Sequence, residues 1–355
     1  MSLKEKFLAW WKNDYKESCP SVGGQAVMEG VMMKGPKCTA ITVRKTDGTM
    51  TYITKPNKTV GEKHKWLKWP FIRGVANFIL MLGDGVKTIM DSADMAGLDT
   101  EEPTKFEKKM AKLFGCKPED VMMVSAVVLA VLMAVGLFIL APLGISELVE
   151  KVLDIHDPWK TVIYMFTRIA LFVGYLYLAT RLKEIKRVFM YHGAEHKSIF
   201  CFEHGEELTV ENARKQSRFH PRCGTSFLVI VMIISLLVAL IVNGILPQDL
   251  NFFLKFLVKL LLLLPVAGIS YEVLKTLGRA KNTWLVRALR WPGLMAQRLT
   301  TQEPDDSMLE VALVSLKASL GWEKPLPESY YAVKEAEDEE EAAPEAEDKT
   351  EEEAK

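Results

Sequence analysis

The chain has 355 residues, of which 49% are hydrophobic, and its 45 basic residues balance its 45 acidic residues. These averages hide a segregation, because the apolar residues gather in a few long runs and twelve of the acids lie in residues 334–355. Uncharged runs of more than twenty residues argue against a soluble protein with buried helices. The five cysteines are an odd number, which argues against a disulfide framework. We expect reduced thiols or metal ligands.

The first 56 residues predict a strand-containing region without a signal peptide. The apolar part of residues 1–20 is too short and too polar for a signal peptide. Residues 23–36 hold four glycines around Glu29, which indicates a tight or left-handed backbone, or close packing on another segment. They contain no phosphate-binding motif. Residues 39–56 predict a β-hairpin that turns at Asp47-Gly48.

Residues 68–97 are apolar but carry Arg73, Asp84 and Lys87 at intervals. This pattern predicts one long or two short helices lying at a membrane interface. A buried helical hairpin of a soluble domain is an alternative.

Four apolar runs predict transmembrane helices, since about twenty residues span the hydrocarbon core. They are residues 121–142, 161–180, 226–247 and 251–270. Arg168 interrupts the second run, and Lys255 and Lys259 lie near the start of the fourth. A charge in the bilayer costs on the order of 2.5–3.5 kcal/mol, which the apolar neighbours offset. Arg168 is expected to face the bundle interior or to serve as a packing or snorkelling residue.

Loop charge predicts the orientation of these helices. Residues 181–225 hold nine Lys and Arg, whereas residues 143–160 hold two. Basic loops remain in the cytoplasm. We therefore expect a multi-pass protein of the bacterial cytoplasmic (inner) membrane, with both termini and the 181–225 loop in the cytoplasm.

The 181–225 loop contains the chemically most informative motif, His192-x-x-Glu195-His196. On a helix that continues from the second span, residues four apart place both imidazoles on one face. Two imidazoles at this spacing can chelate Zn²⁺, and Glu195 projects from the same side as a candidate general base. The motif is the inverted form of the zinc-peptidase pattern His-Glu-x-x-His.

A second pair, His220 and Cys223, precedes the third span. Together with the first pair it would complete a four-ligand site, while three of the four would leave one position open for water. Residues 208–216 predict a short helix between the pairs. Glu272 and Glu29 are weaker candidates for a carboxylate ligand or for orienting a ligand. Solvated loop histidines and a simply buried cysteine are the alternative.

Two further segments follow the fourth span. Residues 278–299 predict a basic interfacial helix, and residues 300–320 predict an amphipathic helix that needs a partner surface. The tail, with twelve acids and three bases, leaves a net charge of +9 on the rest of the chain and indicates disorder.

The expected fold is thus mainly α-helical and polytopic, with a small cytoplasmic α+β N-terminal region and interfacial helices. It divides into an N-terminal region, a first transmembrane pair, the His/Cys/Glu loop, a second transmembrane pair, cytoplasmic amphipathic helices and the acidic tail: 1–120, 121–180, 181–225, 226–270, 271–333 and 334–355.

Several separated motifs resemble the YqhQ-like family of bacterial membrane proteins: "GGQAVMEGVMMKGP", "YHGAEHK", "HPRCGTSF", "ISYEVLK" and "LTTQEPDDSMLEVAL". The resemblance covers most of residues 20–320. It implies a membrane protein whose family is described as a predicted metal-dependent enzyme, or otherwise as a domain of unknown function.

Two functions follow from these patterns. The first is a membrane-embedded hydrolase that uses Zn²⁺ or another divalent metal, bound by His192, His196, His220 and Cys223, with Glu195 as base. The second is a non-catalytic accessory protein whose metal staples the loop, and which assists membrane-protein assembly machinery or binds anionic lipid. A transporter that uses Arg168 and Asn243 is a third. The lipid bilayer is the expected partner, homo-oligomerisation is an open alternative, and sequence-specific nucleic-acid binding is not expected.

Overall fold

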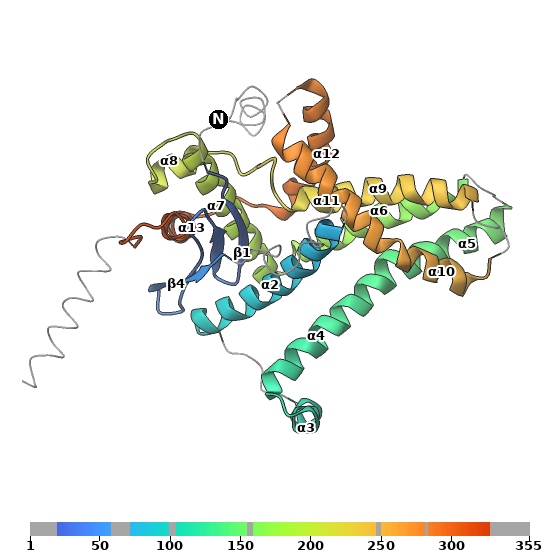
Figure 1. The fold of residues 1–355 in the computed structure, drawn as a ribbon, viewed down its shortest axis with the longest axis horizontal. Helices are drawn as coiled ribbons and strands as arrows, with labels where there is room; N and C mark the ends of the chain where they lie inside the picture. Colours follow the sequence, from blue (N-terminus) through green and yellow to red (C-terminus); the bar gives the residue numbers. More distant parts are fainter. Residues whose placement is uncertain are drawn as a thin grey trace, which may run out of the picture.

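The computed structural model describes residues 20–57, 72–98, 104–154, 159–245, 250–280 and 283–326. The predictions for residues 1–19 and for the acidic tail lie outside the described residues. The described part consists of a small α+β domain and a bundle of long apolar helices, which lie at opposite sides of Figure 1.

The α+β domain is built on a four-stranded antiparallel sheet in the order β1-β2-β3-β4. The predicted hairpin is confirmed, because β3 (Cys38–Arg44) pairs with β4 (Met50–Pro56) and Gly48 adopts a φ of 88° in the turn. The glycine-rich stretch, for which no strand was expected, forms a second hairpin from β1 (Gly23–Val27) and β2 (Gly30–Lys34). Glu29 lies in its turn with a left-handed φ of 49°.

Helices cover both faces of this sheet. Val27, Ile41 and Val43 pack with Ala96 of α2 (Ile72–Ala96) on one face. On the other face, β2 and β3 pack against α13 (Asp306–Ser319), which also contacts α7 (Lys183–Glu203). The sheet is therefore covered by segments from three separate parts of the chain, and the α+β unit is larger than the N-terminal region expected from the sequence.

Helix α13 is the predicted amphipathic helix, and its partner surface is the sheet together with α7. It is buried along almost its whole length, with Leu309, Val311, Ala312 and Leu316 fully shielded from solvent. The Ser315 hydroxyl lies within hydrogen-bond distance of the carbonyls of Val31 and Ala40, at 3.0 and 3.1 Å. One side chain of α13 thus links it to two neighbouring strands.

The segment at 68–97 forms one long helix, α2, in its described residues, and not two short helices or a hairpin. Its end packs on β3 and its first half packs on α11 (Leu263–Arg279), so it bridges the two parts of the molecule. Several apolar side chains in its middle, among them Ile79 and Met81, are exposed. These are the residues that an interfacial position would cover.

Four helical segments are long and apolar enough to cross a membrane, as expected: Asp120–Leu153, Trp159–Ala179, Thr225–Val242 and Phe252–Leu274. The first comprises α4 (Pro118–Val135), a π-helical turn at Gly136–Leu140 and α5 (Ala141–Leu153). The others are α6 (Trp159–Ala179), α9 (Thr225–Ile245), and α10 (Phe252–Leu261) followed by α11 (Leu263–Arg279).

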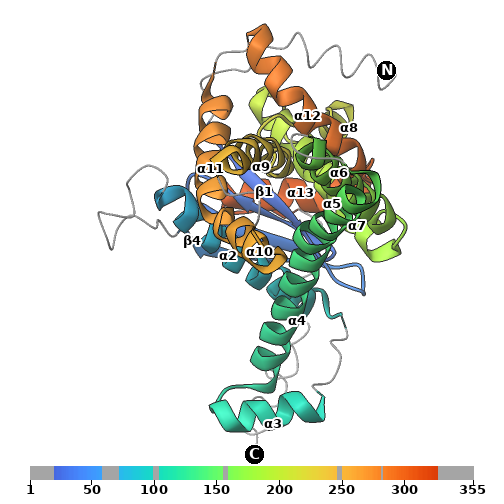
Figure 2. The same cartoon turned by 90° about the vertical axis from the view of Figure 1, so that its right-hand side faces the viewer.

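The apolar side chains of these helices are largely uncovered. Val128 and Leu132 on α4 are 50% and 63% exposed, and α4 stands apart from the other helices in Figure 1 and Figure 2. A soluble monomer rarely exposes an apolar surface this large. Helix α12 (Trp284–Thr300) packs along α9, and α3 (Lys105–Phe114) precedes α4.

One expectation about connectivity is wrong. Helix α7, which carries the His-x-x-Glu-His motif, does not continue from the second span. The chain turns at Thr180–Leu182, Leu182 adopts an extended backbone, and α7 begins at Lys183. The turn lets α7 leave the bundle and pack on β1 and α13.

Candidate metal centre

Helix α7 places His192, Glu195 and His196 on its inner side, because residues three and four apart share a helix face. From Tyr191 to Cys201, ten of the eleven residues in this part of α7 are buried, His192 being half-buried. The segment after α12 crosses α7 at Gly193, where a Cβ atom would overlap the carbonyl oxygen of Gln302. Glycine therefore permits the close crossing that buries the motif.

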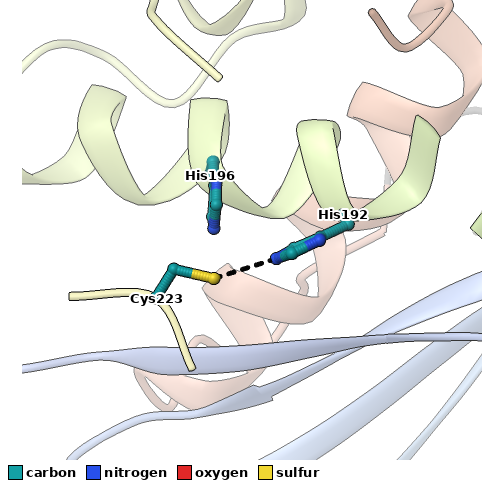
Figure 3. A group of neighbouring side chains, drawn as sticks. All are labelled: His192, His196 and Cys223. Carbon is teal, nitrogen blue, oxygen red and sulfur yellow. Dashed lines mark hydrogen bonds between the residues drawn. The ribbon is translucent and has the colours of Figure 1, made fainter. Parts of the chain in front are cut away.

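His192, His196 and Cys223 form a three-residue cluster, which we call the His/Cys cluster (Figure 3). One potential ligand atom from each residue lies within 4.8 Å of the other two. The Nε2 atom of His192 is 3.1 Å from the Cys223 Sγ atom. Cys223 reaches the cluster from the turn that precedes α9, so the cluster joins the α+β domain to the bundle.

Backbone carbonyls orient both imidazoles. The Nδ1 atom of His192 is 2.8 Å from the Thr300 carbonyl, and the Nδ1 atom of His196 is 2.5 Å from the Arg218 carbonyl. A carbonyl can only accept, so each Nδ1 carries a hydrogen, and in the neutral imidazole each Nε2 presents a lone pair. Among the described residues, the buried Nε2 of His196 has no hydrogen-bond partner. Ligating histidines in metalloproteins are oriented in this way.

Opposing effects act on the pKa of the Cys223 thiol. Burial raises the pKa of the thiol, but the neighbouring His196 imidazole and hydrogen bonds with Thr225 lower it by more, so the pKa lies below its usual value. The Thr225 backbone N–H donates to the Cys223 Sγ atom at 3.4 Å. The thiolate is the form of cysteine that binds metals.

Glu195 lies beside the cluster, with its carboxylate 3.9 Å from the Nε2 atom of His192. Burial raises the pKa of Glu195 to about 8, against the opposing effects of His192 and of the Gly24 backbone N–H, which donates to the carboxylate. A Cβ atom on Gly24 would lie 2.7 Å from this carboxylate. The glycine-rich segment therefore packs closely on Glu195, and β1 covers this side of the site.

His220 lies next to the cluster but faces a different group. Its Nε2 atom is 3.3 Å from a carboxylate oxygen of Glu203, the last residue of α7, and Arg222 pairs with the same carboxylate. The Gln297 side chain exchanges two hydrogen bonds with the His220 backbone. Burial, together with Arg290, lowers the pKa of His220 to about 3. The structure thus brings together three of the four expected ligands.

The two weaker carboxylate candidates are engaged elsewhere. Glu272 receives two hydrogen bonds from Arg73 of α2, at 2.7 and 2.5 Å. Glu29 receives a hydrogen bond from Arg187 at 2.5 Å. Each carboxylate therefore joins two segments that are more than 150 residues apart in sequence, and neither belongs to the His/Cys cluster.

Sequence reasoning missed Gly24, Glu203 and the carbonyls of Arg218 and Thr300. The glycine-rich stretch signalled the close approach at Gly24 but not its target. Carbonyl partners carry no sequence signal, because every residue has one. The contact of Glu203 with His220 depends on the length of α7, which ends at Glu203.

A cavity of about 320 Å³ lies among α9, α11 and α12. Arg222 and Ser226, which flank Cys223 in sequence, line it together with apolar side chains such as Ile230, Leu274 and Leu289. It therefore combines polar groups near the metal-ligand candidates with an apolar wall inside the bundle.

Comparisons with known proteins agree with the resemblance noted in the sequence. Residues 69–322 match the family model described as "Protein of unknown function (DUF1385)". The chain is 36% identical to "Uncharacterized protein YqhQ" of Bacillus subtilis (strain 168) over 301 residues, which cover 85% of this chain and 92% of that protein. No solved structure matches. The chain therefore belongs to the YqhQ-like DUF1385 family, whose function is unknown.

Proposed function

We propose that this protein is a metal-dependent hydrolase of the bacterial cytoplasmic membrane, with its metal held by His192, His196 and Cys223. The observation that carries the proposal is the orientation of the cluster. Both imidazoles hold their Nδ1 hydrogens on backbone carbonyls and aim their other nitrogens inward, next to a thiol of lowered pKa.

The donor set favours zinc. Two imidazole nitrogens and one thiolate suit a tetrahedral Zn²⁺ site better than Mg²⁺ or Ca²⁺, which prefer oxygen ligands. Three protein ligands leave a fourth position for water or substrate, which is the arrangement of catalytic zinc sites. His220 could close the site only by leaving Glu203.

Glu195 is the proposed proton carrier. The metal would supply a Lewis acid that acidifies water and polarises an acyl or phosphoryl group. The positive charge of a bound metal would lower the pKa of Glu195, and its carboxylate would then accept the proton of the attacking water and return it to the leaving group. Its burial beside the cluster and the Gly24 N–H hold its carboxylate in place for this exchange.

The membrane position follows from the uncovered apolar helices and from loop charge. The segment 181–225, which holds α7 and Cys223, carries nine Lys and Arg, and such segments remain in the cytoplasm. The His/Cys cluster would then face the cytoplasm where the α+β domain meets the bundle. The cavity lined by Arg222 and Ser226 suits a substrate with an apolar part, such as a lipid or a membrane-protein segment.

One observation favours a purely structural metal. The cluster joins α7 of the α+β domain to the start of α9, so a bound metal would staple the two parts together. In this second function the protein is an accessory factor for membrane-protein assembly machinery or a binder of anionic lipid, and Glu195 only supports the fold.

Metal analysis of the purified full-length chain tests the site. We expect about one equivalent of zinc in the wild type and at least a tenfold loss in His192→Ala, His196→Ala and Cys223→Ser. Cys201→Ser and His204→Ala are the matched controls, because these two residues form hydrogen bonds outside the His/Cys cluster. Cys201 is hydrogen-bonded to the Glu207 carbonyl, and His204 is hydrogen-bonded to the Gln216 side chain. Near-zero metal in every protein, including the wild type, would remove both metal functions.

Glu195→Gln separates catalysis from a structural role. The hydrolase requires this variant to retain its metal and yet fail to complement a strain that lacks the protein. Full complementation with full metal content would leave only the structural function.

A further inference from the structure

The helix bundle contains a cationic cavity at the end opposite the His/Cys cluster. The cavity measures about 100 Å³, several times the space that one water molecule needs, and lies among α5, α6, α9, α10 and α11. Figure 1 shows α5 and α10 at the far side of the bundle from β1 and α13. Along α9, the cavity lies roughly 20 Å from Cys223. It is therefore separate from the proposed metal site.

Four cationic side chains line this cavity: Lys160, Arg168, Lys255 and Lys259. All four are partly buried, and no acidic side chain belongs to the described lining. Two carboxylates lie just outside it, since Glu150 pairs with Lys160 and Glu147 pairs with Lys255 at 3.1 Å. Among the residues that the structure describes around the cavity, the four cations outnumber these two carboxylates.

Arg168 and Lys259 converge on one aromatic residue. The Lys259 ammonium lies 4.0 Å from the centre of the Tyr164 ring, and Arg168 interacts with the Tyr164 hydroxyl one helical turn away. A cation on an aromatic face retains its charge, so it still attracts an anion. Placing cations among apolar helices is costly, and such groups commonly mark a ligand or ion site.

Most of the remaining wall is apolar, and the hydroxyl residues Ser146, Thr161 and Ser235 also line the cavity. Leu143, Val238, Val242 and Val266 line the cavity beside the cationic groups. A free phosphate ion would gain the cationic contacts but would leave these walls uncovered. An anionic amphiphile satisfies both, and basic pockets between membrane helices bind anionic lipid head groups.

We propose that this cavity binds the phosphate group of an anionic phospholipid, with Arg168 and Lys259 as its main contacts and an acyl chain along the apolar walls. The site needs no metal and does not depend on the hydrolase proposal. Its ligand would anchor α6 and α10, whose cationic residues meet there.

The test measures lipid retention by the detergent-purified full-length chain with native mass spectrometry. Phosphatidylglycerol should bind at least tenfold more tightly than phosphatidylcholine, whose choline cation would meet Arg168 and Lys259. The double variant Arg168→Gln/Lys259→Gln should lose at least tenfold of the phosphatidylglycerol affinity. Lys151→Gln is the matched control, because Lys151 is an exposed cation on α5 at the same end of the bundle.

A second variant guards against misfolding of the first. Ala239→Leu fills the cavity from its apolar wall and keeps all four cations, so it should also weaken phosphatidylglycerol binding while Lys151→Gln does not. Unchanged affinity in both the double variant and Ala239→Leu would overturn the site. Equal affinity for the two lipids would overturn its anion selectivity. Inorganic phosphate that binds as tightly as phosphatidylglycerol, measured by calorimetry, would overturn the lipid assignment.

Discussion

The protein buries polar groups in two regions that are built differently. The His/Cys cluster is held by backbone: carbonyls of Thr300 and Arg218 orient the imidazoles, and the Gly24 N–H holds Glu195. The cationic cavity is held by long side chains, which meet carboxylates and one tyrosine ring. Backbone contacts restrict the orientation of these side chains, as a metal site requires. Flexible cations tolerate a ligand of variable shape, as a lipid site requires.

The helices around these regions differ in the same way. Helix α13 is covered by protein on almost every side, whereas most apolar side chains of α4 are uncovered. The α+β domain is therefore closely packed, whereas much of the apolar surface of the bundle is not covered by protein. Substitutions that act through close packing should damage the α+β domain far more than the bundle.

The largest expected effect is that of Gly193→Ala. The new methyl group would overlap the Gln302 carbonyl and push α7 away from the 301–304 segment. We expect a destabilisation of roughly 3 kcal/mol or more, together with loss of metal. Thermal unfolding followed by tryptophan fluorescence, and metal content, are the measurements.

Gly174→Ala in α6 is the control for that substitution, because nothing lies within 4 Å of its added Cβ atom. Alanine is the better helix former, so this variant should unfold at the same or a higher temperature. If both variants were equally harmful, close packing at Gly193 would not be the cause.

The second prediction concerns pH and the metal-free protein. Burial raises the pKa of Glu195 to about 8, so the folded protein binds its proton more tightly than the unfolded chain does. The stabilisation of the folded protein by this bound proton is fully present below the ordinary pKa of a glutamate and is lost as pH rises through about 8. As the pH is raised from about 5 to about 8, the unfolding temperature of the metal-free wild type should decrease. The corresponding loss in the free energy of unfolding should be a few kcal/mol at most.

Glu195→Gln should flatten this fall, because glutamine does not titrate. Glu211→Gln, on the exposed surface of α8 (Val210–Lys215), should keep the wild-type slope. A wild-type slope in Glu195→Gln would mean that another group produces the pH dependence.

The smallest effect compares two fully buried serines. Ser315 connects α13 to carbonyls of two strands, whereas Ser270 donates to the Val266 carbonyl within its own helix, α11. Ser315→Ala should cost about 1 kcal/mol, because it leaves the carbonyls of two other segments without this donor. Ser270→Ala should cost less, since the helix already occupies that carbonyl. Unfolding temperatures measured side by side give the comparison, and a larger loss in Ser270→Ala would contradict it.

Part of this structure follows from local sequence. Some elements have a local sequence pattern that is typical of only one kind of secondary structure. The pattern is length for the four apolar runs, a turn motif for the Asp47-Gly48 hairpin, and apolar periodicity for the helix at 300–320. The short helix predicted at residues 208–216 is also present. The spacing of His192 and His196 places both imidazoles on one helix face whatever surrounds them. The family was also recognisable from separated motifs alone.

Contacts between distant segments were decided only by the tertiary structure. In the sequence, His220 and Cys223 look equivalent as ligands. In the structure, His220 contacts the buried carboxylate of Glu203 at the end of α7, and only Cys223 joins the imidazoles of His192 and His196. Glu29 and Glu272 were candidate metal ligands in the sequence. In the structure, Glu29 accepts a hydrogen bond from Arg187, and Glu272 accepts one from Arg73. Lys259 and Arg168 lie 91 positions apart and meet at Tyr164 only when α10 packs beside α6. Local periodicity determines which face of an element a side chain occupies, whereas its partner depends on which other elements pack there.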